Sequence, residues 1–328
     1  MGTKQNLNGI AAAVGLIILI FDSHHALEGA KAGVDLCLKT AIPSLFPFFI
    51  LSSLLTTSLN SASFLFVQRF AGWIGIPPSA APLLIPAFLG GYPVGAKCIS
   101  DLFHAEQIDR QTGERLLAFC SNAGPSFLFG VLSSFFPRLQ MVWALWLIHI
   151  VSAILTALVI PDHYSTLEEQ KKNHPGNKST DIMTSALKAI AIVCGWVILF
   201  RVIISYLHFW GLTGFPEWLQ VLVVGILELT NGCCALEMVA DIQLRFILCS
   251  CMLSWGGICV LMQTVSVTKG LSPRNYITGK LLQTAFSFLM SCGIMCRNGW
   301  IFMAIIPFLF ISLRRIKNRC GNIALDPV

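Results

Sequence analysis

Long apolar runs joined by short polar connections dominate the hydrophobic pattern of the chain. A helix needs roughly 20 apolar residues to cross a hydrocarbon layer that is ~30 Å thick, and about eight runs approach that length. The pattern therefore predicts an all-α polytopic membrane protein. The predicted spanning helices are 8–23, 36–59, 114–136, 139–161, 183–207, 243–268, 276–296 and 298–313.

Two further apolar segments, 80–100 and 217–238, are interrupted near the middle by residues that break helices. The first contains GGYP at 90–93, and the second contains TNG at 230–232. Because each half is too short to cross the bilayer, we predict re-entrant hairpins that enter the membrane and return to the same side. A kinked spanning helix is the alternative for either segment.

The order of these elements occurs twice. A helix, a hairpin and two helices make up 36–161, and the same series makes up 183–296 with the opposite direction through the bilayer. In each half an arginine, Arg115 or Arg245, precedes an apolar run with small residues and a helix breaker. Inverted repeats with discontinuous helices are typical of secondary transporters, which bind their substrate where the broken elements meet. We therefore expect one membrane domain over 1–328 that contains an inverted repeat.

The basic residues indicate the orientation, because cytoplasmic loops are enriched in Lys and Arg. With both hairpins re-entrant, both termini, the linker 162–182, the loop 269–275 and the basic tail 314–328 are expected to be cytoplasmic. Fifteen basic residues then lie inside, namely Lys4, Arg69, Arg110, Arg115, Lys171, Lys172, Lys178, Lys188, Lys269, Arg274, Lys280, Arg314, Arg315, Lys317 and Arg319. Five lie outside, namely Lys31, Lys39, Arg138, Arg245 and Arg297. Lys97 and Arg201 remain within the membrane region.

The composition agrees with a membrane protein that contacts lipid. Of the 328 residues, 55% are hydrophobic and 12% are charged, whereas about 25% of residues are charged in soluble domains. The net charge of +6 follows from the topology and gives no reason to expect a nucleic-acid partner. The run 10–21 resembles a signal peptide, but the AKA motif at 30–32 lies too far from it for cleavage, so we expect the first helix to be retained.

Twelve cysteines and seven histidines raise the question of a metal site. Most of the cysteines lie within apolar runs, where cysteine behaves as a small hydrophobic residue. His24 and His25 are adjacent, but the sequence indicates no ligand geometry that they share with an acid or a thiol. The chain contains no HExxH or GxSxG motif and no pair of intramembrane aspartates. We therefore expect no metal, no cofactor and no catalytic residue, and an intramembrane enzyme is the disfavoured alternative.

Five segments carry a family resemblance, in this order: IPSLFPFFILSSLL (42–55), FLGGYPVGAKCISDL (88–102), ERLLAFCSNAGPSFLFGVL (114–132), LELTNG (227–232) and SWGGICVLMQ (254–263). They resemble the YlbJ/SpoVV family of sporulation integral membrane proteins, which belongs to the nucleoside-recognition or Gate-domain group. The resemblance covers about residues 30–300. The second-half motifs depart from the family pattern because they contain cysteines, as in ELTNGCCAL.

The resemblance implies a fold and a function. The fold would be similar to that of concentrative nucleoside transporters, with two re-entrant hairpins facing two broken helices. The function would be to move dipicolinic acid toward the developing spore, across the mother-cell-derived outer forespore membrane of an endospore-forming bacterium. A nucleoside permease and a non-transporting scaffold for assembly of the spore envelope are the alternatives.

The first-half candidates for binding this small anion are residues of the two breaks, namely Gly91, Tyr92, Pro93, Gly95, Lys97, Ser121, Asn122 and Gly124. A half-helix that starts after such a break offers free N–H groups and a partial positive charge to an anion. Pro125 suits the first turn of such a half-helix. Lys97 would add a full charge, unless it extends to the cytoplasmic surface or pairs with Asp101. A packing kink is the alternative for the break before Pro125.

The second-half candidates are Thr230, Asn231, Gly256 and Gly257. A carboxylate does not attract a dianion, so we expect Glu228 to bind a coupling cation, carry a proton, or neutralise Lys97 or Arg201. Tyr92, Phe127 or Trp255 could stack on a pyridine or on a nucleobase. The sequence leaves open the substrate, the ion coupling and whether the chain forms a homo-oligomer.

Overall fold

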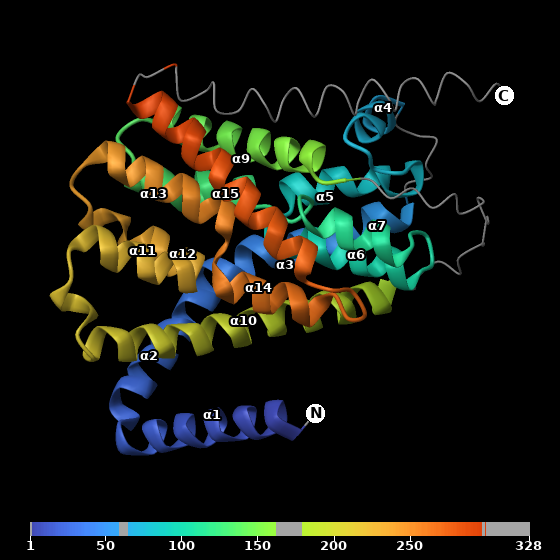
Figure 1. Ribbon diagram of the computed structural model, residues 1–328. Helices are drawn as coiled ribbons and strands as arrows, with labels where there is room; N and C mark the ends of the chain where they lie inside the picture. The colour runs from blue at the N-terminus through green and yellow to red at the C-terminus, as the bar shows by residue number, and fades with distance from the viewer. Residues whose placement is uncertain (1, 59–64, 162–178, 297–298, 300–328) are drawn as a thin grey trace.

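The structure is a computed structural model that describes residues 2–58, 65–161, 179–296 and 299, and this part of the chain is helical without a β-strand (Figure 1). Within these described ranges, four helices are long and apolar enough to cross a membrane, or up to five if one bent pair counts as a span. The four are Ser23–Leu51, Leu139–Val159, Ile182–Phe209 and Ile242–Val267. A helical protein with several candidate spans is therefore confirmed, and eight spans stay a prediction. The expected span 298–313 (apart from Gly299), most of the linker and the basic tail lie outside the described residues.

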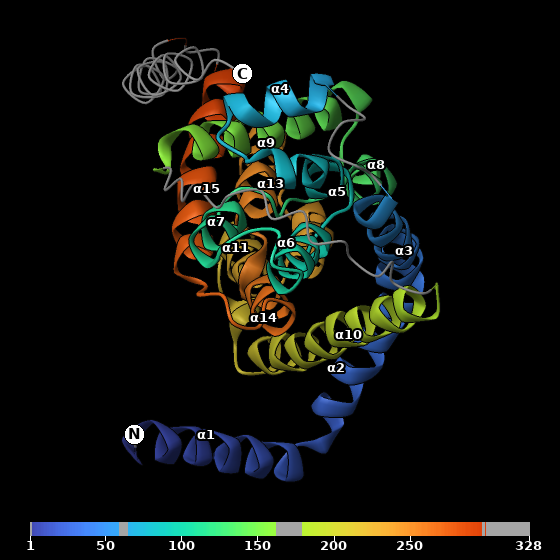
Figure 2. The ribbon, with the colours of Figure 1, turned by 90° about the vertical axis from the view of Figure 1, so that its right-hand side faces the viewer.

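The N-terminal helices contain one long candidate span. α1 (Gly2–Phe21) stands apart from the other helices in both ribbon views, and many of its apolar side chains are exposed (Figures 1 and 2). α2 (Ser23–Leu36) continues through the π-helical turn η1 (Cys37–Ala41) into α3 (Ile42–Ser58). Short π-helical segments are frequent at functional sites, and this one borders the pocket described below.

α2 packs along α10 (Ser179–Phe209), as Figure 1 shows. Two glycines make this contact close: a Cβ added to Gly29 or Gly33 would lie 2.8 Å from the backbone of α10. Small residues at such positions let two helix backbones approach one another, which is how membrane helices commonly associate. α10 therefore holds the first long helix against the rest of the molecule.

The first expected hairpin is present as a helix, a break and a returning helix. α4 (Leu65–Trp73) and the 3₁₀ helix η3 (Pro78–Leu83) lead into α5 (Leu84–Leu89), and α6 (Val94–His104) packs beside α5. The chain turns at 90–93, where Gly91 has a φ of 82° and the Tyr92–Pro93 peptide bond is cis. A positive φ suits glycine because it has no Cβ. Re-entry of this hairpin into a bilayer stays a prediction.

The second expected hairpin breaks earlier than the sequence suggested. The 3₁₀ helix η5 (Leu212–Gly214) precedes α11 (Glu217–Leu227), and α12 (Leu229–Ala235) with η6 (Leu236–Met238) forms the returning arm. The break lies at Glu228, and the prediction of a break at 230–232 is wrong. The Glu228 carboxylate accepts the N–H groups of Thr230 and Asn231, so these residues begin a helix instead of interrupting one.

Two further helices are broken, as the sequence predicted. α7 (Arg110–Leu117) ends in an irregular segment, 118–124, and α8 (Pro125–Gly130) and η4 (Leu132–Phe135) follow. The expected helix 114–136 is therefore interrupted by the segment that leads to Pro125. In the second half, α13 (Ile242–Trp255) and α14 (Gly257–Val267) meet at Gly256, which has a φ of 80°.

The remaining helices assemble around the broken ones. α9 (Leu139–Val159), α13 and α15 (Arg274–Met295) lie side by side, and α15 also packs on α7 (Figure 1). α15 coincides with the expected span 276–296, but it is not among the four candidate spans. The reason is a row of buried polar side chains at positions 280, 283, 287 and 291, which lowers its hydropathy and leads to the site.

Candidate functional site

The four interruptions of the helices meet in one region. A Cβ added to Gly124 would lie 2.9 Å from the Gly91 nitrogen, so the first hairpin and the first broken helix cross at these glycines. A Cβ added to Gly257 would lie 3.1 Å from the last carbonyl oxygen of α11, so the second hairpin crosses the second broken helix. The Tyr92 ring of the first half packs against Gly256 of the second half, since a Cβ added to Gly256 would lie 3.4 Å from this ring. Backbone breaks that line a cavity are typical of transporter binding sites.

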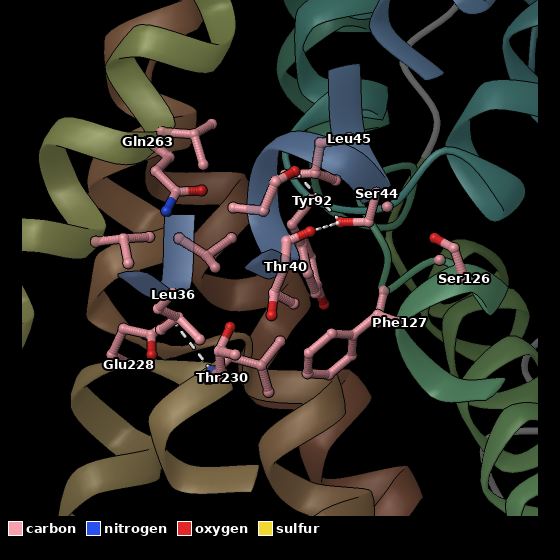
Figure 3. A pocket seen from close by; sticks show the side chains of 18 residues that line it. Leu36, Thr40, Ser44, Leu45, Tyr92, Ser126, Phe127, Glu228, Thr230 and Gln263 are labelled. Carbon is pink, nitrogen blue, oxygen red and sulfur yellow. Dashed lines mark hydrogen bonds between the residues drawn. The ribbon is translucent and has the colours of Figure 1, made fainter. Parts of the chain in front are cut away.

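A pocket lies where these breaks meet (Figure 3). It contains about 640 Å³ of empty space, part of it open to the surroundings. The two hairpin breaks line it with Gly91, Tyr92, Glu228, Leu229 and Thr230. The broken helices line it with Ala123, Gly124, Ser126, Phe127, Val260 and Gln263.

The long helix α2–η1–α3 and α10 line the other side. The side chains of Thr40 and Ser44 face the pocket from the first of these helices, and Val193 and Val197 line it from α10. The Ser44 hydroxyl donates to the Thr40 carbonyl oxygen at 2.6 Å. Figure 3 shows the Thr40 side chain turned toward Phe127 and Thr230. The π-helical turn η1 thus brings the Thr40 hydroxyl group to the pocket.

The pocket wall is neutral apart from one carboxylate. Hydroxyl groups, the Gln263 amide and the rings of Tyr92 and Phe127 are its polar and aromatic groups, and no Lys or Arg lines it among the described residues. Glu228 is buried, and its carboxylate accepts three hydrogen bonds at 2.6–3.1 Å, from the Thr230 and Asn231 N–H groups and from the Asn231 side chain. The residues that the structure describes offer it no ion pair with Lys97 or Arg201. Glu228 therefore stabilises the start of α12 at the edge of the pocket.

A buried lysine lies directly behind the Tyr92 ring. Lys280 of α15 has 0% exposure, and its Nζ atom donates to the Tyr92 hydroxyl oxygen at 3.0 Å, to the Ser121 carbonyl oxygen at 2.5 Å and to Gln283 Oε1 at 2.7 Å. The Tyr92 hydroxyl donates in turn to the Leu253 carbonyl oxygen at 3.0 Å. One ammonium group therefore joins the tip of the first hairpin to the irregular segment 118–124.

The amide groups beside Lys280 continue this network. Gln283 Nε2 donates to Asn122 Oδ1 at 3.0 Å, and Asn122 Nδ2 donates to the carbonyl oxygens of Ala87 and Phe119. Asn122 has 0% exposure, so its side chain is engaged within the protein and does not line the pocket. Gly279 lets α15 come this close, because a Cβ there would overlap the backbone of Ala118.

A second buried group joins α9, α13 and α15. The Ala123 N–H donates to His149 Nε2 at 3.0 Å, so the ring proton of the neutral imidazole lies on Nδ1, which donates to Ser254 Oγ at 3.3 Å. The Ser254 and Ser287 hydroxyls are 2.5 Å apart, Ser287 donates to Ser152 Oγ, and Ser152 donates to the His149 carbonyl oxygen. Because each hydroxyl has one proton, Ser254 must donate to Ser287. The hydrogen bonds form a closed ring that begins and ends at His149.

The predicted site residues separate into two groups. Gly91, Tyr92, Gly124, Thr230 and Glu228 line the pocket. The others support it without being among the residues that line it: Pro93, Gly95, Lys97, Ser121, Asn122, Asn231, Gly256 and Gly257. The supporting contacts are close, since a Cβ on Gly95 would overlap the Cys120 carbonyl group. Substrate binding by either group stays a prediction.

Lys97 is paired with a carboxylate on its own helix. Its Nζ atom lies 2.6 Å from Asp101 Oδ2, one helical turn further on, and the Lys97 side chain is 9% exposed whereas the Asp101 side chain is 47% exposed. This ion pair is the structural alternative that the sequence offered for Lys97.

Two basic residues counted as cytoplasmic are buried instead. Lys280 is 0% exposed and Arg115 is 6% exposed, so neither belongs in the count of loop charges. The Arg115 side chain donates to four backbone carbonyl oxygens, those of Ile74, Gly75, Ala157 and Pro161. Arg245, counted as external, donates similarly to the carbonyl oxygens of Phe135 and Val239. The matching arginines of the two halves therefore both bind the ends of neighbouring segments.

The structure also corrects the expectation for the adjacent histidines. Ligand atoms of His24, His25 and Glu28 lie within 4.8 Å of one another at the start of α2. The His25 ring nitrogen Nδ1 already contacts the Asp22 carboxylate at 2.8 Å. The helical spacing brings the three side chains together, with His24 and Glu28 exposed, and the sequence pattern had not indicated this geometry.

A comparison with known proteins agrees with the resemblance that the sequence motifs indicate. No family model and no solved structure matches the chain. The chain is similar to the sporulation integral membrane protein YlbJ of Bacillus subtilis (strain 168), with 26% identity over 318 residues, covering 80% of this chain and 76% of the relative. This similarity supports the YlbJ-type family. The YlbJ-type resemblance expected from the motifs is thereby confirmed, and the likeness to concentrative nucleoside transporters stays a prediction.

Proposed function

We propose that this YlbJ-type chain is a membrane transporter of a small aromatic solute. The observation that carries the proposal is the pocket at which four helix breaks meet, with Tyr92 and Phe127 on its wall. The rings of Tyr92 and Phe127 offer faces on which an aromatic solute can stack. Broken helices around a central site can change their packing without exposing unpaired backbone groups to lipid.

The solute that fits the family best is dipicolinic acid. The curated relative is named as a sporulation integral membrane protein, and dipicolinate transport is what the motif resemblance implies. A flat pyridine dicarboxylate needs hydrogen-bond donors at two ends and a slot for its ring. The hydroxyls of Thr40, Ser44 and Thr230 and the amide of Gln263 are donors of this kind.

A nucleoside permease is the second candidate, and the neutral pocket wall favours it. No Lys or Arg lines the pocket in the described ranges, whereas hydroxyls and an amide suit the ribose and base of a nucleoside. The two candidates differ in the charge that the solute carries, so the charge preference of binding separates them.

The cellular setting belongs to the same proposal. We place the chain in the outer forespore membrane of a spore-forming bacterium, with both termini in the mother-cell cytoplasm. Glu228, at the edge of the pocket, is the residue at which a coupling cation would act. Assembly into a homo-oligomer is compatible with the exposed apolar faces of α1.

Uptake by proteoliposomes tests the function. The purified chain is reconstituted, and accumulation of labelled dipicolinate and of labelled uridine is measured with and without an imposed ion gradient. Saturable uptake of dipicolinate supports the proposal, and uptake of uridine alone supports the permease. If neither solute enters, the non-transporting scaffold replaces both. Empty liposomes and the Gly124→Val variant, whose side chain would fill the crossing at Gly91, are the controls.

A further inference from the structure

No described carboxylate pairs with the Lys280 amino group. It is fully buried, and none of the ion pairs in the described part of the chain includes it. Its three donors are all directed at neutral oxygens, those of Tyr92, Ser121 and Gln283. An ammonium group has three protons to donate, so the site uses the full hydrogen-bonding capacity of the charged form.

The position of Tyr92 brings this charge to the pocket. Lys280 Nζ lies 4.8 Å from the centre of the Tyr92 ring, and Tyr92 lines the pocket. Interactions between charges are strong where water is excluded, so an ammonium group one side chain away still acts on a solute in the pocket. The Tyr92 hydroxyl, bonded to Lys280, is the group that can pass this effect on.

Glu228 does not cancel the charge. Three N–H donors of its own hairpin already bind its carboxylate, which compensates it locally. The Lys97 charge is likewise neutralised by Asp101. The Lys280 ammonium is thus not paired with either of these carboxylates, and it lies on the Tyr92 side of the pocket.

We propose that Lys280 determines the charge specificity of the pocket by stabilising an anionic group, such as a carboxylate, of a solute that is held against Tyr92. The inference rests on the proposed function and adds the residue that selects an anion over a neutral solute. It also explains how the pocket could take an anion although no Lys or Arg lines it among the described residues. The cation lies behind the wall, where it attracts the solute without holding it in a direct ion pair.

The test measures binding of two probes of the same shape by the purified full-length protein. Pyridine-2,6-dicarboxylate is the charged probe and pyridine-2,6-dicarboxamide is the neutral one. We expect the parent protein to prefer the dicarboxylate. Lys280→Met keeps the approximate length of the side chain and removes its charge, so it should reduce that preference roughly 10- to 100-fold, with a much larger loss of affinity for the dicarboxylate than for the diamide. Lys280→Arg should restore part of the preference.

Lys188→Met is the matched control, because Lys188 is exposed on α10. Equal loss of both probes in Lys280→Met would mean that Lys280 only supports the fold, and it would overturn the inference. A preference that survives Lys280→Met, or a parent protein without any preference or binding, would overturn it as well. If Lys280→Met does not fold, Tyr92→Phe takes its place, and an unchanged preference in that variant is the overturning result.

The outcomes for this inference and for the proposed function differ. Charge-selective binding without uptake into proteoliposomes would remove transport and leave the role of Lys280 intact. Uptake of dipicolinate that Lys280→Met and Tyr92→Phe reduce no more than uptake of the diamide would support transport and remove Lys280 from solute selection.

Discussion

The Lys280 ammonium lies 3.0 Å from the Tyr92 hydroxyl oxygen, although 188 residues separate the two in the sequence. Tyr92 belongs to the tip of the first hairpin, and Lys280 belongs to the last described helix. The two halves of the chain are therefore joined at Tyr92 by two hydrogen bonds, with Lys280 and with the Leu253 carbonyl oxygen, and by one cation–π contact. A movement of the hairpin tip has to break these contacts or carry α15 with it.

The crossing of two backbones at Gly91 and Gly124 leaves no room for a side chain. Gly124→Ala places a Cβ 2.9–3.0 Å from the backbone of the first hairpin. We expect this overpacking to cost about 1–3 kcal/mol of unfolding free energy and to reduce uptake. Thermal unfolding in detergent measures the first effect. Gly130→Ala is the control, because nothing lies within 4 Å of the Cβ there; a similar loss in both variants would contradict the packing argument.

The hydrogen-bond ring should respond as a unit. Ser254→Ala removes the acceptor of His149 Nδ1 and the donor to Ser287, which should cost roughly 1–3 kcal/mol of stability. The double variant Ser254→Ala/Ser287→Ala should cost less than the sum of the single variants, because either change already opens the ring. Ser134→Ala, at an exposed position in η4, should have little effect. Strict additivity in thermal unfolding would argue against a shared ring.

Lys97 is expected to act through Asp101 and not on the solute. Lys97→Gln and Asp101→Asn remove the two ends of the same ion pair, so we expect each to change binding of dipicolinate and of its neutral diamide by the same factor. An (i, i+4) pair with one exposed partner contributes about 0.5 kcal/mol, so the stability change should be small. A loss in Lys97→Gln that is confined to the dicarboxylate would return Lys97 to the binding site.

The orientation in the membrane can be tested at positions outside the described residues. Single cysteines at Lys171 and Asn318, on a background without the twelve native cysteines, should both react with a membrane-impermeant reagent from the cytoplasmic side. The expectation follows from the enrichment of Lys and Arg in the linker and the tail. Labelling of the two positions from opposite sides would disprove the topology with two re-entrant hairpins.

Most helix breaks could be predicted because their causes are local. Pairs of glycines, or glycine next to proline, favour an interruption of a helix, so the breaks at 90–93, before Pro125 and at Gly256 could be read from the sequence. The second hairpin was misplaced because the Glu228 side chain binds the N–H groups that follow it. A capping residue of this kind converts an apparent break into the start of a helix.

The buried cation was not predicted, although a signal was present. Tyr276, Lys280, Gln283 and Ser287 follow the spacing of one helix face, so a polar row in α15 could have been found in an apolar segment. Lys280 was counted as a loop charge because it lies near the start of that segment. Its partners Tyr92 and Ser121 are distant in sequence, and such contacts follow only from the packing of the two halves.

The ring at His149 has a consequence for the permeability of the bilayer around it. Chains of hydroxyl groups can conduct protons when they connect one side of a membrane to the other. Here each donor is committed to the next group, and the last hydroxyl, that of Ser152, returns to the residue at which the series starts. That residue receives the last hydrogen bond on its backbone carbonyl oxygen, which accepts a hydrogen bond but has no proton to pass on, so the series of donors ends there. The ring can therefore hold three helices together across a polar interior without dissipating a proton gradient.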